Sequence, residues 1–221
     1  MKIGLLLLII AFLLVLAAGI HQGWWWLLLW PAFSFALVAA GYFYLGPCVF
    51  GKSEQGLIPL RNQFLLLPYL LYLIGIWHLS RLIRQEQAIH QLTDTLLISR
   101  RLLSKELPGQ VAHVIDLTCE FNESQALRSV GYFCFPILDR SVPSQVELRT
   151  WIEKTASLEG TVLVHCAEGH GRTGLFTAAL LLDSGQAETV AEALQLIQRQ
   201  RPRVRLSREQ KQILEDFSNG H

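Results

Sequence analysis

Charged side chains are nearly absent from the first third of this 221-residue chain. Residues 1–80 contain only Lys2, Lys52, Glu54 and Arg61, whereas residues 81–221 hold 16 of the 19 Lys and Arg and 17 of the 18 Asp and Glu. This asymmetry is typical of a membrane region followed by a water-soluble domain. The formal net charge of +1 provides no broad basic face, so we expect no nucleic-acid partner.

Closely spaced cysteine pairs are also missing. The four cysteines, Cys48, Cys119, Cys134 and Cys166, form no CxxC pattern. The sequence therefore predicts neither a zinc site nor a disulfide framework, and we expect no metal and no cofactor. A reactive cysteine that has to stay reduced favours the cytoplasm.

Two long apolar runs open the chain. Residues 3–20 carry no charge and are long enough to cross most of a bilayer. Residues 24–46 begin with a tryptophan cluster and end with tyrosines, the aromatic belts typical of the two membrane interfaces. Because only His21, Gln22 and Gly23 separate the two runs, we favour a transmembrane hairpin over a cleaved signal peptide.

A third apolar segment, residues 64–79, is shorter and contains Pro68. Sixteen residues rise roughly 24 Å as a helix, less than a ~30 Å hydrocarbon core. We therefore favour two spans and an interfacial or re-entrant third segment, with three spans and an external amino terminus as the alternative. Both arrangements give a multi-pass membrane protein whose membrane region (1–84) precedes a cytoplasmic domain (85–221).

The soluble part predicts strands and helices in alternation. For residues 85–103 the sequence predicts a polar connector that is either helical or irregular. Short β-branched and aromatic runs predict strands at 111–118, 132–139 and 161–166. Amphipathic patterns with capping signals predict helices at 144–157, 172–184, 189–200 and 207–217. This order indicates an α/β domain with a central, mostly parallel sheet flanked by helices.

The stretch "HCAEGHGRTG", residues 165–174, lies where the last predicted strand ends and a helix begins. Gly169 and Gly171 free the backbone to curl, so that N–H groups and a helix amino terminus face a tetrahedral oxyanion. Arg172 adds a planar fork of donors that matches phosphate oxygens. The same surroundings stabilise a thiolate at Cys166, which makes this side chain a nucleophile.

This stretch resembles the HCxxGxxR[ST] signature of the cysteine-dependent protein tyrosine and dual-specificity phosphatases. The resemblance implies a phosphatase fold for about residues 95–217, with Cys166 as nucleophile and Arg172 as phosphate ligand. It also implies that Thr173 hydrogen-bonds the thiolate and helps it depart, and that His165 tunes the thiolate. The implied substrate-binding loop comprises Ala167, Glu168, Gly169, His170, Gly171 and Arg172.

The resemblance further implies a general acid upstream of the loop. Asp139 lies 27 residues before Cys166 (166 − 139) and directly follows a predicted strand, and we favour it over Asp116, which we expect to be structural. Gln210 matches a water-positioning glutamine of some relatives, but we favour a helix-surface role. Cys119 or Cys134 could form a protective disulfide with Cys166, as in some relatives, although simple burial is favoured.

The substrate class stays open between two alternatives. A phosphorylated protein is the family default, whereas a phospholipid such as phosphatidylglycerophosphate suits an active site tethered to a bilayer. The loop has no lysine, which disfavours a polyphosphorylated inositol lipid. A non-catalytic phosphate-binding module is a third, less favoured reading. We expect the arginines of one late segment to face solvent or anionic lipid: Arg199, Arg201, Arg203, Arg205 and Arg208.

Overall fold

The computed structural model of the protein describes residues 2–84 and 86–219. The chain forms two compact units. The first contains Met1–Ser53, Leu57–Gln85 and Cys119–Asn122, and the second contains Glu54–Gly56, Glu86–Thr118 and Glu123–His221. Two short segments therefore belong to a different unit from the residues on either side of them in the sequence: Glu54–Gly56 belongs to the second unit and Cys119–Asn122 to the first.

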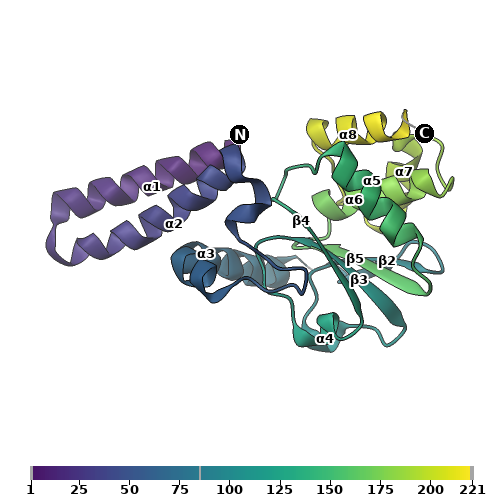
Figure 1. The fold of residues 1–221 in the computed structure, drawn as a ribbon, viewed down its shortest axis with the longest axis horizontal. Coiled ribbons are helices and arrows are strands. Elements are labelled where there is room, and N and C mark those ends of the chain that lie inside the picture. Colours follow the sequence, from purple (N-terminus) through teal and green to yellow (C-terminus); the bar gives the residue numbers. More distant parts are fainter. Residues whose placement is uncertain (1, 85, 220–221) are drawn as a thin grey trace. The chain divides into compact units, whose positions relative to one another are not determined.

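The first unit consists of helices. Its elements are α1 (Lys2–His21), the 3₁₀ helix η1 (Gly23–Leu28), α2 (Leu29–Ala40), the π-helical turn η2 (Gly41–Leu45), the 3₁₀ turn η3 (Gly46–Val49) and α3 (Leu60–Ile83). Helices α1 and α2 lie side by side as a hairpin (Figure 1). Three helical stretches are long and apolar enough to cross a membrane: Lys2–His21, Gly23–Val49 and Leu60–Ile83.

Helix α3 corrects the expectation of a short third segment. It contains 24 residues, or about 36 Å of helical rise, because it extends beyond the apolar residues 64–79 at both ends. Pro68 lies inside it and does not end it. The N–H of the following residue, Tyr69, donates to the buried Ser34 hydroxyl at 3.3 Å, which helps to satisfy the backbone near the proline. The length argument against a third span is therefore wrong.

The second unit is built on a five-stranded sheet of order β1-β2-β5-β3-β4. Its strands are β1 (Ile89–Gln91), β2 (Leu96–Arg100), β3 (Val111–Thr118), β4 (Gly131–Ile137) and β5 (Thr161–Cys166). All neighbouring pairs are parallel except β1 with β2. The predicted α/β class with a mostly parallel sheet is confirmed.

The expected connector at 85–103 is wrong, because it contains β1 and β2. Strand β2 pairs along its full length with the central strand β5, and Leu97 and Ile98 are buried on opposite faces of the sheet. A five-residue strand buried on both faces shows no alternation of polar and apolar side chains, so its sequence gives little periodic signal.

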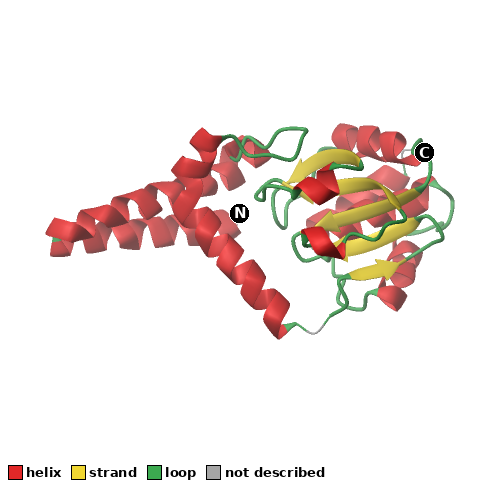
Figure 2. Ribbon diagram, turned by 90° about the horizontal axis from the view of Figure 1, so that it is seen from below, coloured by secondary structure: helices red, strands yellow, loops and turns green. Residues whose placement is uncertain are grey.

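Helices cover the two faces of the sheet unequally. Helices α5 to α8 lie over one face, and the short α4 lies at the other (Figures 1 and 2). Their bounds are α4 Gln125–Arg128, α5 Gln145–Ala156, α6 Gly171–Asp183, α7 Val190–Gln200 and α8 Arg208–Ser218, with a 3₁₀ turn η4 at Ser104–Glu106. Ser144, Thr189 and Ser207 cap α5, α7 and α8 by accepting an N–H of the first turn.

The hydrophobic core follows the two-residue period of the strands. Val162 and Val164 of β5 pack in the cluster beneath the helices with Phe176, whereas Leu163 between them packs in a second cluster with Leu127 of α4. Both faces of the central strand are thus buried, which fixes its register and the position of its last residue, Cys166.

We predict that Leu148→Ala, in the buried face of α5, destabilises the second unit by about 2–5 kcal/mol because it leaves a cavity. Leu148 is fully buried, whereas Val146 on the same helix is 75% exposed, so Val146→Ala is the matched control and changes stability by no more than about 0.5 kcal/mol. Pulse proteolysis of the full chain in urea measures both. Equal effects of the two substitutions would contradict this assignment of the core.

Candidate active site

The loop from Cys166 to Arg172 lies at the carboxyl end of the central strand β5. Cys166 is the last residue of β5 and Gly171 is the first of α6. Ligand sites of open α/β sheets form at this edge. Cys166 is buried, and no disulfide joins the cysteines of the described chain.

The backbone of the loop is oriented by hydrogen bonds to its outer side. The Arg101 N–H donates to the Ala167 carbonyl at 3.2 Å, and Arg201 Nη2 donates to the Glu168 carbonyl at 3.0 Å. In a planar trans peptide the C=O and N–H groups point in opposite directions. The following N–H groups are therefore directed inward, and that of Gly169 donates to Cys166 Sγ at 3.2 Å.

Only glycine fits at position 169. Its φ is +72°, and a Cβ there would lie 2.5 Å from the Ser99 carbonyl oxygen at the end of β2. Gly171 has no such constraint, because it begins α6 and a Cβ would lie 3.5 Å from the flexible Gln210 side chain. Of the two glycines between Cys166 and Arg172, only Gly169 has the left-handed conformation.

The structure brings Arg172 and Asp139 together. Arg172 is buried, and its Nη1 donates to the Ile137 carbonyl at 2.8 Å at the end of β4. Its Nη2 lies 3.5 Å from Asp139 Oδ1. The Asp139 side chain is 57% exposed, so it can exchange protons with solvent beside the loop. Asp139 thus lies beside the loop, and its role as general acid stays a prediction.

Asp116, the rival acid, is fully buried inside the domain. Its Oδ1 accepts from the N–H and hydroxyl of Thr118, and its Oδ2 accepts from the Tyr132 hydroxyl at 2.7 Å. Burial, and the negative charge of Asp116, raise the pKa of Tyr132, so the phenol stays a donor to this carboxylate. These contacts give Asp116 a structural role.

His165 and Thr173 are both fully buried. His165 Nε2 lies 3.6 Å from Glu123 Oε2 and 3.9 Å from Asp116 Oδ1. Within residues 2–84 and 86–219, neither the His165 ring nor the Thr173 hydroxyl makes a hydrogen bond. The Thr173 hydroxyl is thus not engaged elsewhere in the described chain, whereas its expected bond to the Cys166 sulfur is not formed in this structure.

Asp116, Glu123 and His165 also have the spacing of metal ligands, with their nearest donor atoms within 4.8 Å of one another. However, Arg101 Nε lies 3.4 Å from Glu123 Oε2, and both oxygens of Asp116 already accept hydrogen bonds. A guanidinium at the ligand atom supplies the positive charge that a cation would bring. The donor set therefore does not fit a resident metal ion.

Two residues at this site correct the sequence analysis. Arg201, expected at the surface, is 1% exposed and reaches the loop. Gln210, also expected on a helix surface, is buried and donates to the Ser141 carbonyl at 3.4 Å. The helical spacing of both residues indicated that they would be buried. Arg201 follows Ala193 and Ile197 on the buried side of α7. Gln210 lies on the same buried side of α8 as Ile213 and Leu214.

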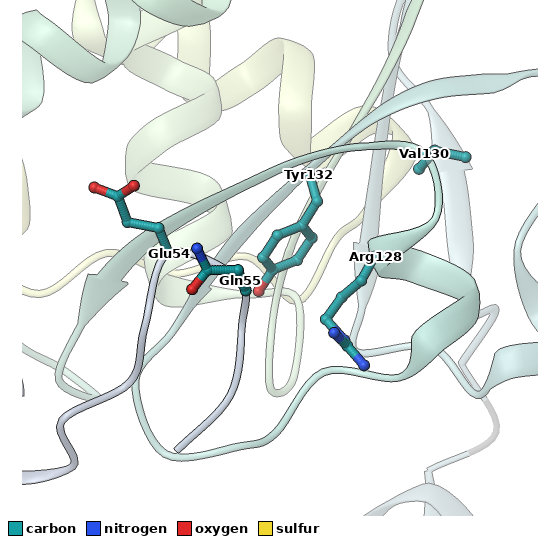
Figure 3. Close-up of a pocket in the computed structure, with 5 residues that line it drawn as sticks. All are labelled: Glu54, Gln55, Arg128, Val130 and Tyr132. Atoms are coloured by element: carbon teal, nitrogen blue, oxygen red, sulfur yellow. The ribbon is translucent and has the colours of Figure 1, made fainter. Parts of the chain in front are cut away.

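A separate pocket of about 380 Å³ is lined by Glu54, Gln55, Arg128, Val130 and Tyr132 (Figure 3). Gly56, at φ +80°, packs so closely on the Tyr132 hydroxyl that any Cβ there would overlap it. None of the residues of the Cys166 loop lines this pocket.

We predict that Gly169→Ala weakens phosphate binding at least about tenfold, because a Cβ would collide with the Ser99 carbonyl and turn the 169 N–H away from the loop. Gly185→Ala is the matched control, since Gly185 also has a positive φ, of +67°, but open space around it. The control costs roughly 1–2 kcal/mol of stability and keeps phosphate affinity. Calorimetric titration with inorganic phosphate measures this, and unchanged affinity in Gly169→Ala would contradict the prediction.

Comparisons with known proteins identify the family and the fold of the second unit. The family model "dual specificity phosphatase, catalytic domain" matches residues 103–219. Among solved structures, Tk-PTP in its active form is 27% identical and covers 60% of this chain and 97% of its own, with a TM-score of 0.53. PTPMT1 in complex with PI(5)P is 20% identical, covering 61% of this chain and 96% of its own at TM-score 0.54.

Human DUSP28 is 14% identical and covers 61% of this chain and 95% of its own, with a TM-score of 0.52. Among curated proteins no relative matches the sequence. The family model alone spans more than half of the chain and includes the Cys166 loop, Asp139 and Arg201. The chain belongs to the dual specificity phosphatase family.

Proposed function

We propose that this phosphatase hydrolyses phosphate monoesters through a covalent phosphocysteine on Cys166. The observation that carries the proposal is the 3.2 Å hydrogen bond from the Gly169 N–H to Cys166 Sγ. It joins a nucleophile to an anion-binding loop, with Arg172 and Asp139 beside it. A module that only reads phosphorylated partners has no need for a nucleophile and an acid in one site.

The first step forms the S–P bond and breaks the ester P–O bond. The inward N–H groups of the loop, the amino terminus of α6 and the Arg172 guanidinium hold the phosphoryl oxygens. The Cys166 thiolate attacks phosphorus from the base of the loop. Asp139, in its protonated form, donates its proton to the leaving oxygen, so that an alcohol rather than an alkoxide departs.

The second step reverses these roles. The Asp139 carboxylate takes a proton from a water molecule, whose oxygen attacks phosphorus. The S–P bond breaks, inorganic phosphate is released, and Cys166 leaves as a thiolate. The Thr173 hydroxyl, fully buried and not otherwise engaged within the described chain, is the donor that we assign to the departing sulfur.

We further propose that the phosphatase unit is anchored in a membrane by the first unit, with the catalytic unit in the cytoplasm. Helices α1 and α3 and the stretch Gly23–Val49 have the length and apolar composition for this. We favour two spans with an internal amino terminus and α3 at the interface, because this topology keeps Lys52, Arg81 and Arg84 on the cytoplasmic side, together with Glu54–Gly56, which belongs to the second unit. Three spans with an external amino terminus would place Glu54–Gly56 on the opposite side of the membrane from the rest of its unit.

Two substrate classes fit such an enzyme. A phosphorylated protein follows from the family to which the chain belongs. A phospholipid with one terminal phosphate is favoured by the short connection to the bilayer: only three residue steps, at most about 11 Å of extended chain, separate Ile83 of α3 from Glu86, whose carboxylate contacts His170 of the loop. PTPMT1, whose fold this chain shares, binds a phosphoinositide.

The test compares the full chain in mixed micelles against an aryl phosphate, a phosphotyrosine peptide and phosphatidylglycerophosphate. We expect hydrolysis of the aryl phosphate, and a fall in kcat on the order of 10⁴-fold in Cys166→Ser. The substrate with the higher kcat/KM identifies the class. If wild type and Cys166→Ser both bind phosphate but are equally inactive, the protein is instead a non-catalytic phosphate-binding module.

We predict that Asp139→Asn lowers kcat for alkyl phosphates by about 10²- to 10⁴-fold, because their leaving oxygens need a proton. An activated aryl phosphate leaves without protonation, so its turnover changes much less. Steady-state kinetics with the two esters measures the difference. Asp116→Asn serves as comparison and has no such leaving-group dependence. Equal slowing of both esters in Asp139→Asn would assign the acid to another residue.

A further inference from the structure

A cluster of three side chains lies against the outer side of the phosphate loop. His170 Nε2 lies 2.9 Å from Glu86 Oε2, and because a carboxylate only accepts, the hydrogen is on Nε2. The same carboxylate oxygen lies 3.4 Å from Arg201 Nη2. Glu86 therefore joins a residue of the loop to an arginine at the end of α7. We refer to Glu86, His170 and Arg201 as the clamp.

Arg201 connects the clamp to the loop backbone. Its Nη2 donates to the Glu168 carbonyl at 3.0 Å, and its Nη1 donates to the Gln87 carbonyl at 3.3 Å. The guanidinium thus bridges the segment after Glu86 and the loop. The Glu168 carbonyl and the Gly169 N–H belong to one peptide group and point in opposite directions. The bond that holds the carbonyl outward therefore directs this N–H to Cys166 Sγ.

The charge of Glu86 is needed to keep this guanidinium in place. Arg201 is 1% exposed, and a buried cation is stable only with a partner. Burial lowers the pKa of Arg201, whereas the negative charges of Glu86 and Cys166 act in the opposite direction. The Glu86 side chain is itself only 15% exposed, so water screens its interaction with Arg201 weakly.

We propose that Glu86 and Arg201 are positioning residues of the phosphatase: through the clamp they fix the Glu168–Gly169 peptide so that its N–H stabilises the Cys166 thiolate. Neither residue touches the reacting atoms. This inference rests on the proposed function of Cys166, but it concerns the ionisation of the sulfur and the shape of the loop. Both can be measured in the absence of any turnover.

The experiment uses the full chain in detergent micelles and compares wild type with Glu86→Gln, which keeps the size of the side chain and removes its charge. The rate of alkylation of Cys166 by iodoacetamide is followed against pH by mass spectrometry of the peptide that carries it. We expect the apparent pKa of Cys166 to rise by about one pH unit in Glu86→Gln, which corresponds to a tenfold loss of thiolate stabilisation. Phosphate affinity, from calorimetry, falls about tenfold as well.

Several controls separate positioning from general destabilisation. Glu188→Gln removes an exposed carboxylate outside the clamp and leaves both readouts unchanged. Leu148→Ala provides a destabilised protein with an intact clamp. Arg201→Lys retains the positive charge but loses the planar guanidinium that donates to both the Glu168 and the Gln87 carbonyls. It therefore shifts the pKa of Cys166 in the same direction as Glu86→Gln.

The inference is overturned if the pKa of Cys166 in Glu86→Gln stays within about 0.3 pH units of wild type, the precision of a titration midpoint. A shift of equal size in Leu148→Ala would overturn it too, because loosening of the fold would then suffice. Failure of the proposed function looks different: no ester is hydrolysed by wild type, while the alkylation and phosphate readouts still respond to Glu86→Gln.

Discussion

The chemistry that we propose for this protein depends on one hydrogen bond, from the Gly169 N–H to Cys166 Sγ. A backbone amide can stabilise a thiolate only when its peptide group is fixed, and three contacts fix this one. The Ser99 carbonyl leaves no room for a side chain at position 169, and Arg101 and Arg201 hold the neighbouring carbonyls outward. Because β5 is buried on both faces, the sulfur is fixed as firmly as the amide.

Much of this arrangement follows from local sequence. The motif at residues 165–174 predicted the loop, its strand and its helix, since each depends on residues close in the chain. The partners of the loop from distant segments were harder to predict. Glu86 lies in a segment whose strands are too short to show a period, and Arg201 lies among exposed arginines, so composition there indicated a surface. Its spacing from Ala193 and Ile197 was the informative signal.

The apolar first unit shows the opposite case: its composition predicted long apolar helices correctly, whereas the length of the third helix was underestimated. Counting apolar residues alone assigned 16 residues to the third segment, whereas α3 continues through polar residues at both ends to 24. Pro68 did not break the helix, and the N–H that follows it found the buried hydroxyl of Ser34 on α2. Such a tertiary compensation cannot be read from the segment itself, because the partner lies 35 residues away.

The two edges of the sheet offer little backbone for pairing with another molecule. Its outer strands are β1, with three residues, and β4, which carries Pro136 and so lacks one ladder N–H. Short strands and prolines are the devices by which sheets resist adding a strand from another molecule. The short edge strand β1 and the proline in β4 therefore oppose edge-to-edge aggregation between copies of the chain.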